Sequence, residues 1–345
     1  MPKRPVTRTP LVGRPGFAPD LAPRKDIPPK EETPVTLENS DTPLAFAAAA
    51  DAPAGTTQIE IDRRVFELYD EYCHGGIDRR TFLMRAAAVT VGGLAMAHAL
   101  MPRYANAQTI SFTDTRIKAN YVSYPSPGGT SGTMRGYLVR PAGNGPFGTV
   151  LVVHENRGLN PYIEDVARRA AVEGFIALAP DGLAPVGGYP GNDDDGRTLQ
   201  AGLDQAKLRT DMLNSAKYLK TIAGSNGKLG VTGFCWGGGT TNWLAAQMGA
   251  DMQAGVPFYG PAADTASVPN IKAPILAQYA EDDPRINDMW PAYEAALKAA
   301  GVPHERHVYP GTQHGFHNNS TPRYVEAAAK LAWERTVAHF RKHLA

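Results

Sequence analysis

From about residue 149 to the C-terminus, short apolar segments alternate with longer segments in which apolar residues recur at helical spacing. The short segments lack polar alternation, which is typical of strands buried on both faces of a parallel sheet. The predicted strands, including two β-rich segments that come earlier, are Ile110–Tyr124, Thr133–Arg140, Thr149–His154, Phe175–Ala179, Leu229–Phe234, Gly255–Tyr259, Ile275–Tyr279 and Arg306–Tyr309. The predicted helices are near Ile163–Glu173, Gln205–Thr221, Thr240–Met248, Met289–Ala300 and Arg323–His343. The pattern predicts an α/β fold with a mostly parallel central sheet and helices on both faces. Functional residues are then expected in loops past the carboxyl ends of strands.

The N-terminal part of the chain has a different composition. Residues 1 to about 55 are rich in Pro and Ala without a sustained apolar period, so we expect disorder there. A short amphipathic helix is predicted near Ile59–Tyr72. Together these features make up a leader over residues 1–76.

Residues 77–107 have the three parts of an export signal. Arg79 and Arg80 precede Phe82 and Leu83, an apolar run extends to Leu100, and Ala105-Asn106-Ala107 follows as a cleavage site. The arginine pair resembles the twin-arginine signal, which implies the twin-arginine export machinery as a partner and an exported, periplasmic mature chain. The run is too short for a stable membrane span. The alternatives for this segment are a small core helix or a signal anchor, and the alternative to export is a cytoplasmic protein. Residues 108–345 form the predicted catalytic domain.

Cys235 lies in Gly233-Phe234-Cys235-Trp236-Gly237, between a predicted strand and a predicted helix. A Gly-x-nucleophile-x-Gly sequence makes a turn so sharp that the residues around the nucleophile must be small. The turn places the side chain at a helix N-terminus, where the helix dipole favours a thiolate. The alternative is a buried structural cysteine.

A base and an acid follow in the order that such hydrolases use, nucleophile, acid, histidine. His314 lies in a Gly-flanked loop after the last predicted strand, and Asp282 and Asp283 follow the strand before it. In such hydrolases the catalytic acid is commonly followed by two residues and then an apolar anchor residue. Ile286 occupies that anchor position relative to Asp283. The predicted triad is therefore Cys235, Asp283 and His314, in which the aspartate orients the histidine.

Glu155 ends the predicted strand Thr149–His154 and is expected to face the same crevice as Cys235. The alternative is a glutamate that only forms a salt bridge with Arg157. The backbone N–H groups of Asn156 and Trp236 are predicted to form an oxyanion hole.

These motifs together resemble the dienelactone hydrolase (carboxymethylenebutenolidase) family, over roughly residues 130 to 345. The resemblance implies the α/β-hydrolase fold and the opening of ester or lactone rings through an acyl-enzyme. It also implies that the glutamate at the position of Glu155 contacts the resting thiol. Family members that act on dienelactone bind its carboxylate with arginines, one of them shortly after the catalytic histidine. No arginine occurs in residues 315–319 of this chain, which argues against dienelactone itself as the substrate.

Composition excludes several other functions. A net charge of +1 gives no reason to expect nucleic acid, and two cysteines, Cys73 and Cys235, make no disulfide framework. Neither a metal nor an organic cofactor is expected, because the two histidines of each His-x-x-His pair, at 304 and 307 and at 314 and 317, would point to opposite faces of a strand. Asp193–Asp195 are interpreted as a solvated turn rather than a calcium site, and Trp236 and Tyr259 as pocket or packing residues.

The sequence thus predicts a cofactor-independent hydrolase of small ester or lactone substrates that uses a Cys-Asp-His triad. Two other functions remain open. One is a catalytically silent protein of the same fold that serves as a binding or interaction module. The other is a thiol redox role, which the absence of a second cysteine in a mature chain disfavours.

Overall fold

The computed structural model describes residues 62–73, 76–90, 94, 97 and 108–345. The predicted disordered segment and the predicted cleavage site lie outside these residues. Two helices come first, α1 (Arg63–Cys73) and α2 (Arg79–Val89). The first lies where the sequence predicts a short amphipathic helix. Within the described ranges, no helix is both long and apolar enough to cross a membrane.

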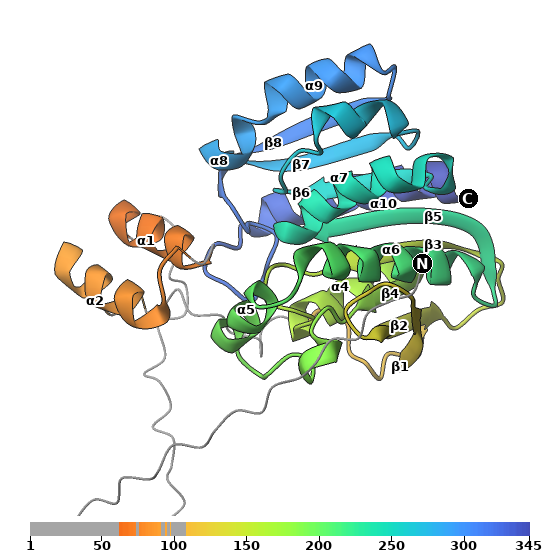
Figure 1. The fold of residues 1–345 in the computed structure, drawn as a ribbon, viewed down its shortest axis with the longest axis horizontal. Helices are drawn as coiled ribbons and strands as arrows, with labels where there is room; N and C mark the ends of the chain where they lie inside the picture. The colour runs from red at the N-terminus through yellow and green to blue at the C-terminus, as the bar shows by residue number, and fades with distance from the viewer. Residues whose placement is uncertain (1–61, 74–75, 91–93, 95–96, 98–107) are drawn as a thin grey trace, which may run out of the picture. The chain divides into compact units, whose positions relative to one another are not determined.

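The core of the molecule is an eight-stranded sheet (Figure 1). Its strands are β1 (Ile117–Ser126), β2 (Gly132–Pro141), β3 (Phe147–Val153), β4 (Ile176–Pro180), β5 (Ser225–Phe234), β6 (Ala254–Phe258), β7 (Ile275–Asp282) and β8 (His304–Gln313). They lie side by side in the order β1-β2-β4-β3-β5-β6-β7-β8. The first three in that order pair antiparallel, and all other neighbours pair parallel. The predicted mostly parallel sheet is confirmed.

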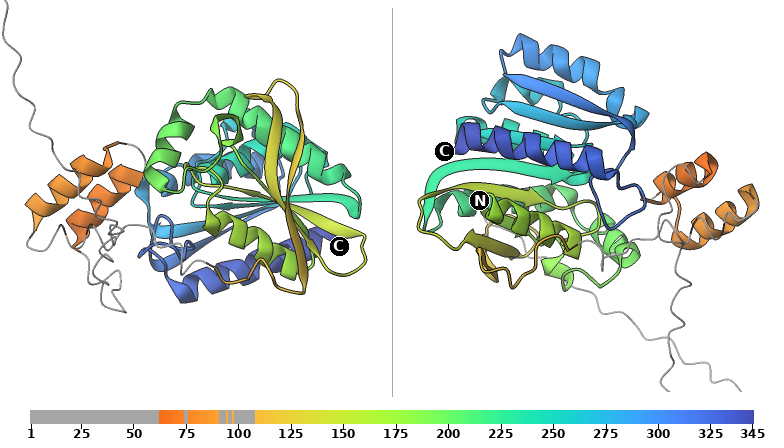
Figure 2. Two further views of the ribbon diagram at one scale, coloured as in Figure 1. Left: turned by 90° about the horizontal axis from the view of Figure 1, so that it is seen from below. Right: turned by 180° about the vertical axis from the view of Figure 1, so that it is seen from behind.

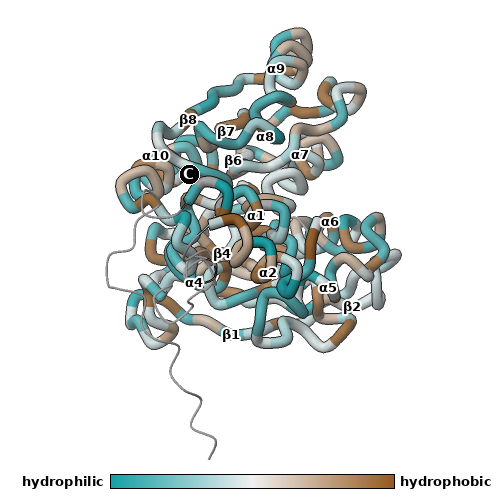
Figure 3. Tube along the Cα trace, turned by 90° about the vertical axis from the view of Figure 1, so that its left-hand side faces the viewer, coloured by the Kyte–Doolittle hydropathy of each residue, from teal (hydrophilic) through white to brown (hydrophobic). Residues whose placement is uncertain are grey.

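Helices cover both faces of this sheet (Figure 2). The helices after the first two are α4 (Pro161–Val172), α5 (Asp193–Ala201), α6 (Gln205–Thr221), α7 (Trp236–Met248), α8 (Pro284–Asn287), α9 (Trp290–Ala299) and α10 (Glu326–Leu344). Three short 3₁₀ segments are η3 (Ala184–Val186), η4 (Gly249–Asp251) and η5 (Thr265–Asn270). Hydrophilic and hydrophobic residues alternate along α6, as expected of a helix with one buried side (Figure 3).

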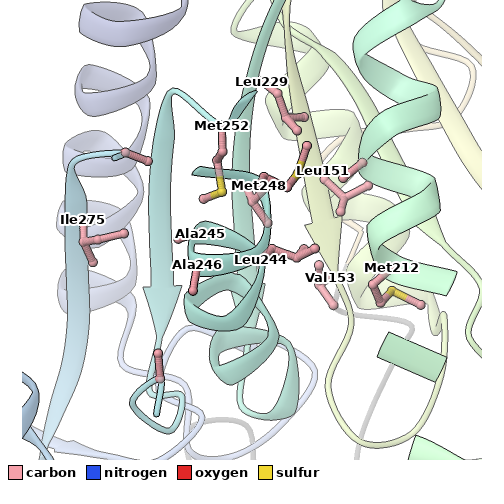
Figure 4. Packing of buried hydrophobic residues seen from close by; sticks show 14 of the residues in the cluster. Leu151, Val153, Met212, Leu229, Leu244, Ala245, Ala246, Met248, Met252 and Ile275 are labelled. Atoms are coloured by element: carbon pink, nitrogen blue, oxygen red, sulfur yellow. The ribbon is translucent and has the colours of Figure 1, made fainter. Parts of the chain in front are cut away.

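Two hydrophobic cores result, one on each face of the sheet. Along β3, Leu151 and Val153 belong to the core beneath α6, α7 and α9, whereas Val150 and Val152 belong to the core beneath α4 and α10. Successive side chains of a strand point to opposite faces, and every one of these four is fully buried. Figure 4 shows the first core between β3, α6 and α7. The uniformly apolar strand therefore reflects burial on both sides.

Two elements differ from the sequence prediction. β1 begins at Ile117 rather than Ile110, because the intervening residues pass over α4, where Asp165 accepts hydrogen bonds from the N–H groups of Thr109 and Ile110. The predicted solvated turn at residues 193–195 is wrong, since these aspartates form the first turn of α5. Asn192 caps that helix through the N–H of Asp195, and carboxylates in a first turn are favoured by the helix dipole.

Candidate active site

Cys235 lies at the sharp turn between β5 and α7. Its φ of 55° and ψ of −115° place a non-glycine residue in a strained backbone conformation. The turn also requires close backbone contacts, because a Cβ atom on Gly237 would lie 2.3 Å from the carbonyl oxygen of Val153. A Cβ atom on Gly233 would lie 2.2 Å from the carbonyl oxygen of Gly237. Both glycines are thus needed to present Cys235 at the carboxyl end of the sheet.

His314 and Asp283 come from the loops after β8 and β7. Asp283 Oδ2 accepts a hydrogen bond of 2.6 Å from His314 Nδ1, and both side chains are almost fully buried. Asp282 is exposed and instead accepts a hydrogen bond of 3.2 Å from Gln313. The structure therefore brings Asp283, and not Asp282, to the histidine.

Cys235 and His314 line the same small pocket, and Cys235 is close enough to influence the pKa of His314. Burial by itself lowers the pKa of an imidazole, but Cys235 and the Asp283 carboxylate outweigh it and raise the pKa of His314. An imidazole in this position favours the protonated form when the sulfur is a thiolate. The arrangement is suited to moving a proton between Cys235 and His314.

Glu155 follows β3 and is buried beside these residues. Burial raises its pKa, the Arg157 guanidinium lowers it, and Cys235 raises it further, with a net increase. Its Oε2 lies 3.6 Å from Arg157 Nε and accepts a hydrogen bond of 3.1 Å from Asn318. The predicted position facing Cys235 and the alternative ion pair with Arg157 are thus both present.

Arg157 is held from its other side by α5. Its Nη1 donates a hydrogen bond of 2.7 Å to Asp193 Oδ2, and Tyr189 donates one of 3.0 Å to the other oxygen. Asp193 is therefore a buried ion-pair partner next to the site. In the sequence, Asn192 followed by three aspartates could have predicted the start of α5, because an asparagine cap and an acidic first turn are typical of a helix N-terminus.

His154 is a buried residue of the site that sequence reasoning missed. Its Nε2 accepts a hydrogen bond of 3.2 Å from the N–H of Gly182, so Nδ1 carries the proton and donates to the carbonyl oxygen of Glu155 at 2.6 Å. Burial lowers the pKa of His154, which favours this neutral form. The hydrogen-bonded carbonyl belongs to the same peptide group as the N–H of Asn156. Because a peptide group is planar, His154 fixes the direction of that N–H. Its ring also stacks on that of Trp236, with centroids 5.5 Å apart.

A small pocket opens over Cys235. Its lining consists of Tyr69, Glu155, Arg157, Cys235, His314, Gly315, Asn318, Thr321 and Arg323. Trp236 and Tyr259, which the sequence singled out, are not among these residues. Tyr259 is fully buried and packs against the His314 ring, with centroids 4.9 Å apart. Arg323 was missed because it comes nine residues after His314, and Tyr69 because it belongs to α1.

The four histidines of the two His-x-x-His pairs have other contacts. His304 hydrogen-bonds the carbonyl oxygen of Val302, and His307 lies 3.0 Å from Glu305. His317 hydrogen-bonds Tyr162 at 2.7 Å. In the part of the chain that the structure describes, no group of three or more His, Cys, Asp or Glu side chains could hold a metal ion.

The sheet order, the strained turn at its carboxyl end and the histidine loop define an α/β hydrolase. Residues 134–344 match the family described as "Dienelactone hydrolase family", and the chain belongs to this family. Residues 53–90, which include α1 and α2, match a second family described as "YqhI-like".

Individual relatives agree with this assignment. The chain is 31% identical to "Putative carboxymethylenebutenolidase" of Methylorubrum extorquens over 76% of its own length and 94% of that protein. It is 62% identical to "Putative hydrolase fragment YghX" of Escherichia coli over 32% of its own length and 95% of that protein. Among solved structures, a "Putative Dienelactone Hydrolase" from Klebsiella pneumoniae is similar with a TM-score of 0.58 and 29% identity. That likeness covers 66% of this chain and 99% of the other.

Proposed function

We propose that the protein hydrolyses small ester or lactone substrates through a covalent acyl-enzyme on Cys235. The observation that carries this proposal is the Asp283–His314 pair beside Cys235, which lies at the strained turn and lines the same pocket as His314. The family membership supports the same reaction class.

The proposed reaction has two halves. His314 takes the proton of the Cys235 thiol, and the thiolate attacks the substrate carbonyl to form a C–S bond. The N–H groups of Asn156 and Trp236 stabilise the oxyanion. His314 then gives its proton to the departing alkoxide as the C–O bond breaks. In the second half, His314 deprotonates a water that attacks the thioester, the C–S bond breaks, and the thiol regains its proton. Asp283 keeps the histidine in the required tautomer throughout.

Glu155 is proposed to hold the resting thiol. A buried carboxyl group with a raised pKa keeps its proton more readily than an exposed one, so it places less negative charge beside the sulfur. Arg157 and Asn318 fix its position from two sides. This role matches the one that the family resemblance implies for the glutamate at this position.

The pocket also supports a substrate that carries a carboxylate. Two guanidinium groups, of Arg157 and Arg323, line it. Arginine binds carboxylates well because its planar donors match their geometry. The absence of arginine in residues 315–319 therefore does not exclude an acidic substrate, since Arg323 reaches the pocket from further along the chain. Comparing matched lactones with and without a carboxylate measures this preference.

A burst experiment tests the proposed nucleophile. On mixing with excess p-nitrophenyl acetate, the protein is expected to release about one equivalent of phenolate quickly if deacylation is slower than acylation, and mass spectrometry is expected to find an acetyl group on Cys235. Cys235→Ala is expected to lower turnover roughly a thousandfold or more. A Cys235→Ala protein that retained most of the activity would refute the proposal. A folded wild-type protein with neither turnover nor acylation would favour the silent binding protein.

Export through the twin-arginine machinery is a separate proposal. It rests on the sequence of residues 77–107. In the structure, Phe82 and Ala86 of this segment are buried with Tyr69 and Tyr72 of α1, as in a small core helix. Cleavage after Ala107 would remove both helices and leave the described catalytic domain. The N-terminus of protein isolated from its native cell decides between a mature chain that begins at Gln108 and one that retains α1.

A further inference from the structure

A tyrosine from the N-terminal helix α1 reaches the active-site pocket. Tyr69 lines the same cavity as Cys235 and His314, and its side chain is only 1% exposed. Its ring lies under the Arg323 guanidinium, whose carbon is 4.5 Å from the ring centroid. Arg323 in turn donates a hydrogen bond of 2.8 Å to the carbonyl oxygen of His314. Tyr69 is thus joined to the catalytic loop through one arginine.

With Tyr69 in place, the pocket is almost full. Its cavity volume is about 10 Å³, which is room for about one water molecule. Cys235 itself is 8% exposed. An acyl group cannot lie beside the sulfur in this arrangement unless a wall of the pocket moves.

The helical pair α1–α2 has a buried cluster of its own. This cluster is separate from the two cores of the sheet and consists of Val65, Tyr69, Tyr72, Phe82, Ala86 and Ala97. The contacts that join the pair to the catalytic domain include polar and cation–π ones. Arg197 lies 4.0 Å from the Tyr72 ring centroid and hydrogen-bonds the Tyr72 carbonyl, and Arg79 lies 3.4 Å from Asp194. Displacing the pair would therefore leave both cores of the catalytic domain intact.

We propose that Tyr69 is a specificity-determining residue, which forms the movable wall of the acyl pocket and limits the size of the acyl group that reaches Cys235. The proposal rests on the proposed function of Cys235 as the nucleophile. It assigns to the N-terminal helical pair a direct part in substrate selection by the chain that retains α1, and it does not apply to a chain cleaved after Ala107. Small acyl groups enter with little movement of Tyr69, and longer ones must displace its ring from Arg323.

The test uses the full-length chain and the ratio of kcat/KM for p-nitrophenyl hexanoate to that for p-nitrophenyl acetate. Tyr69→Ala is expected to raise this ratio about tenfold or more, because the additional methylenes gain space. Tyr69→Trp is expected to lower it, because a larger ring fills the same wall. Met84→Ala, a change at an exposed position of α2, is the control and keeps the wild-type ratio.

A second measurement reports how accessible the Cys235 thiol is to a small reagent, independently of catalytic turnover. The rate at which iodoacetamide alkylates Cys235, followed by peptide mass spectrometry, is expected to rise in Tyr69→Ala and fall in Tyr69→Trp. The proposal would be overturned if the hexanoate-to-acetate ratio of kcat/KM stayed within about twofold of wild type in both variants, or if it shifted in the same direction in both. Opposite shifts support it, since loss of folding would affect both variants alike. Failure of Cys235 as the nucleophile is recognised separately, by retained activity in Cys235→Ala.

Discussion

The choice between two adjacent aspartates gives the sharpest test of the site. Asp283→Asn keeps the volume of the side chain but removes the charge that accepts the 2.6 Å hydrogen bond from His314 Nδ1. The amide can donate to Nδ1, which leaves the proton on Nε2 and prevents the histidine from accepting the proton of Cys235. We expect kcat to fall by roughly 10³–10⁴-fold, which corresponds to about 4–5.5 kcal/mol of lost transition-state stabilisation.

The matched control is Asp282→Asn. Its carboxylate is exposed and accepts a hydrogen bond from Gln313. A surface change of this kind is worth at most about 0.5 kcal/mol, or about a twofold change in rate. Both variants are to be compared by kcat and KM for an aryl ester, with folding checked by circular dichroism.

The pH profile adds an independent readout. The Asp283 carboxylate favours the charged imidazolium and helps to raise the pKa of His314. Its replacement by Asn is therefore expected to lower that pKa and to move the acid limb of kcat/KM toward lower pH. Equal losses of activity in the two asparagine variants, or a larger loss in Asp282→Asn, would refute the assignment of Asp283.

Three further predictions concern other parts of the molecule. Glu155→Gln is expected to raise Tm relative to wild type increasingly as pH rises: burial raises the pKa of Glu155 above its usual 4.5, so the folded wild type holds this proton more tightly and loses that stabilisation as the pH passes the raised pKa. Scanning calorimetry across pH checks it, and a pH-independent difference in Tm would contradict it. His154→Gln is expected to lower kcat by about 10–1000-fold with a smaller change in KM, because the Asn156 N–H loses its fixed direction. An effect confined to KM would count against that role. Replacing Arg79 and Arg80 by Lys is expected to leave full-length precursor in the cytoplasm, as read by immunoblotting of cell fractions. Unchanged processing would speak against a twin-arginine signal.

The sequence by itself determines where strands and helices alternate. A strand that is buried on both faces, such as β3, carries apolar residues at successive positions, and this pattern is visible in the sequence. It also determines the turn at Cys235, since only glycine tolerates the close approach at Gly233 and Gly237. The choice of Asp283 over Asp282 could be predicted from the apolar anchor Ile286 three residues after Asp283, and the structure places Asp283 against His314.

Only the tertiary structure decides the contacts between residues far apart in the chain. Arg323 reaches the pocket because the chain after His314 folds back so that its guanidinium meets the His314 carbonyl. Tyr69 belongs to a helix that carries no chemical motif, and its place beside Cys235 depends on how α1 contacts Arg323 and Arg197. The role of His154 depends on two hydrogen bonds, one of them to Gly182. Such contacts leave no local periodicity or spacing in the sequence, because their energy comes from surfaces that meet only after folding.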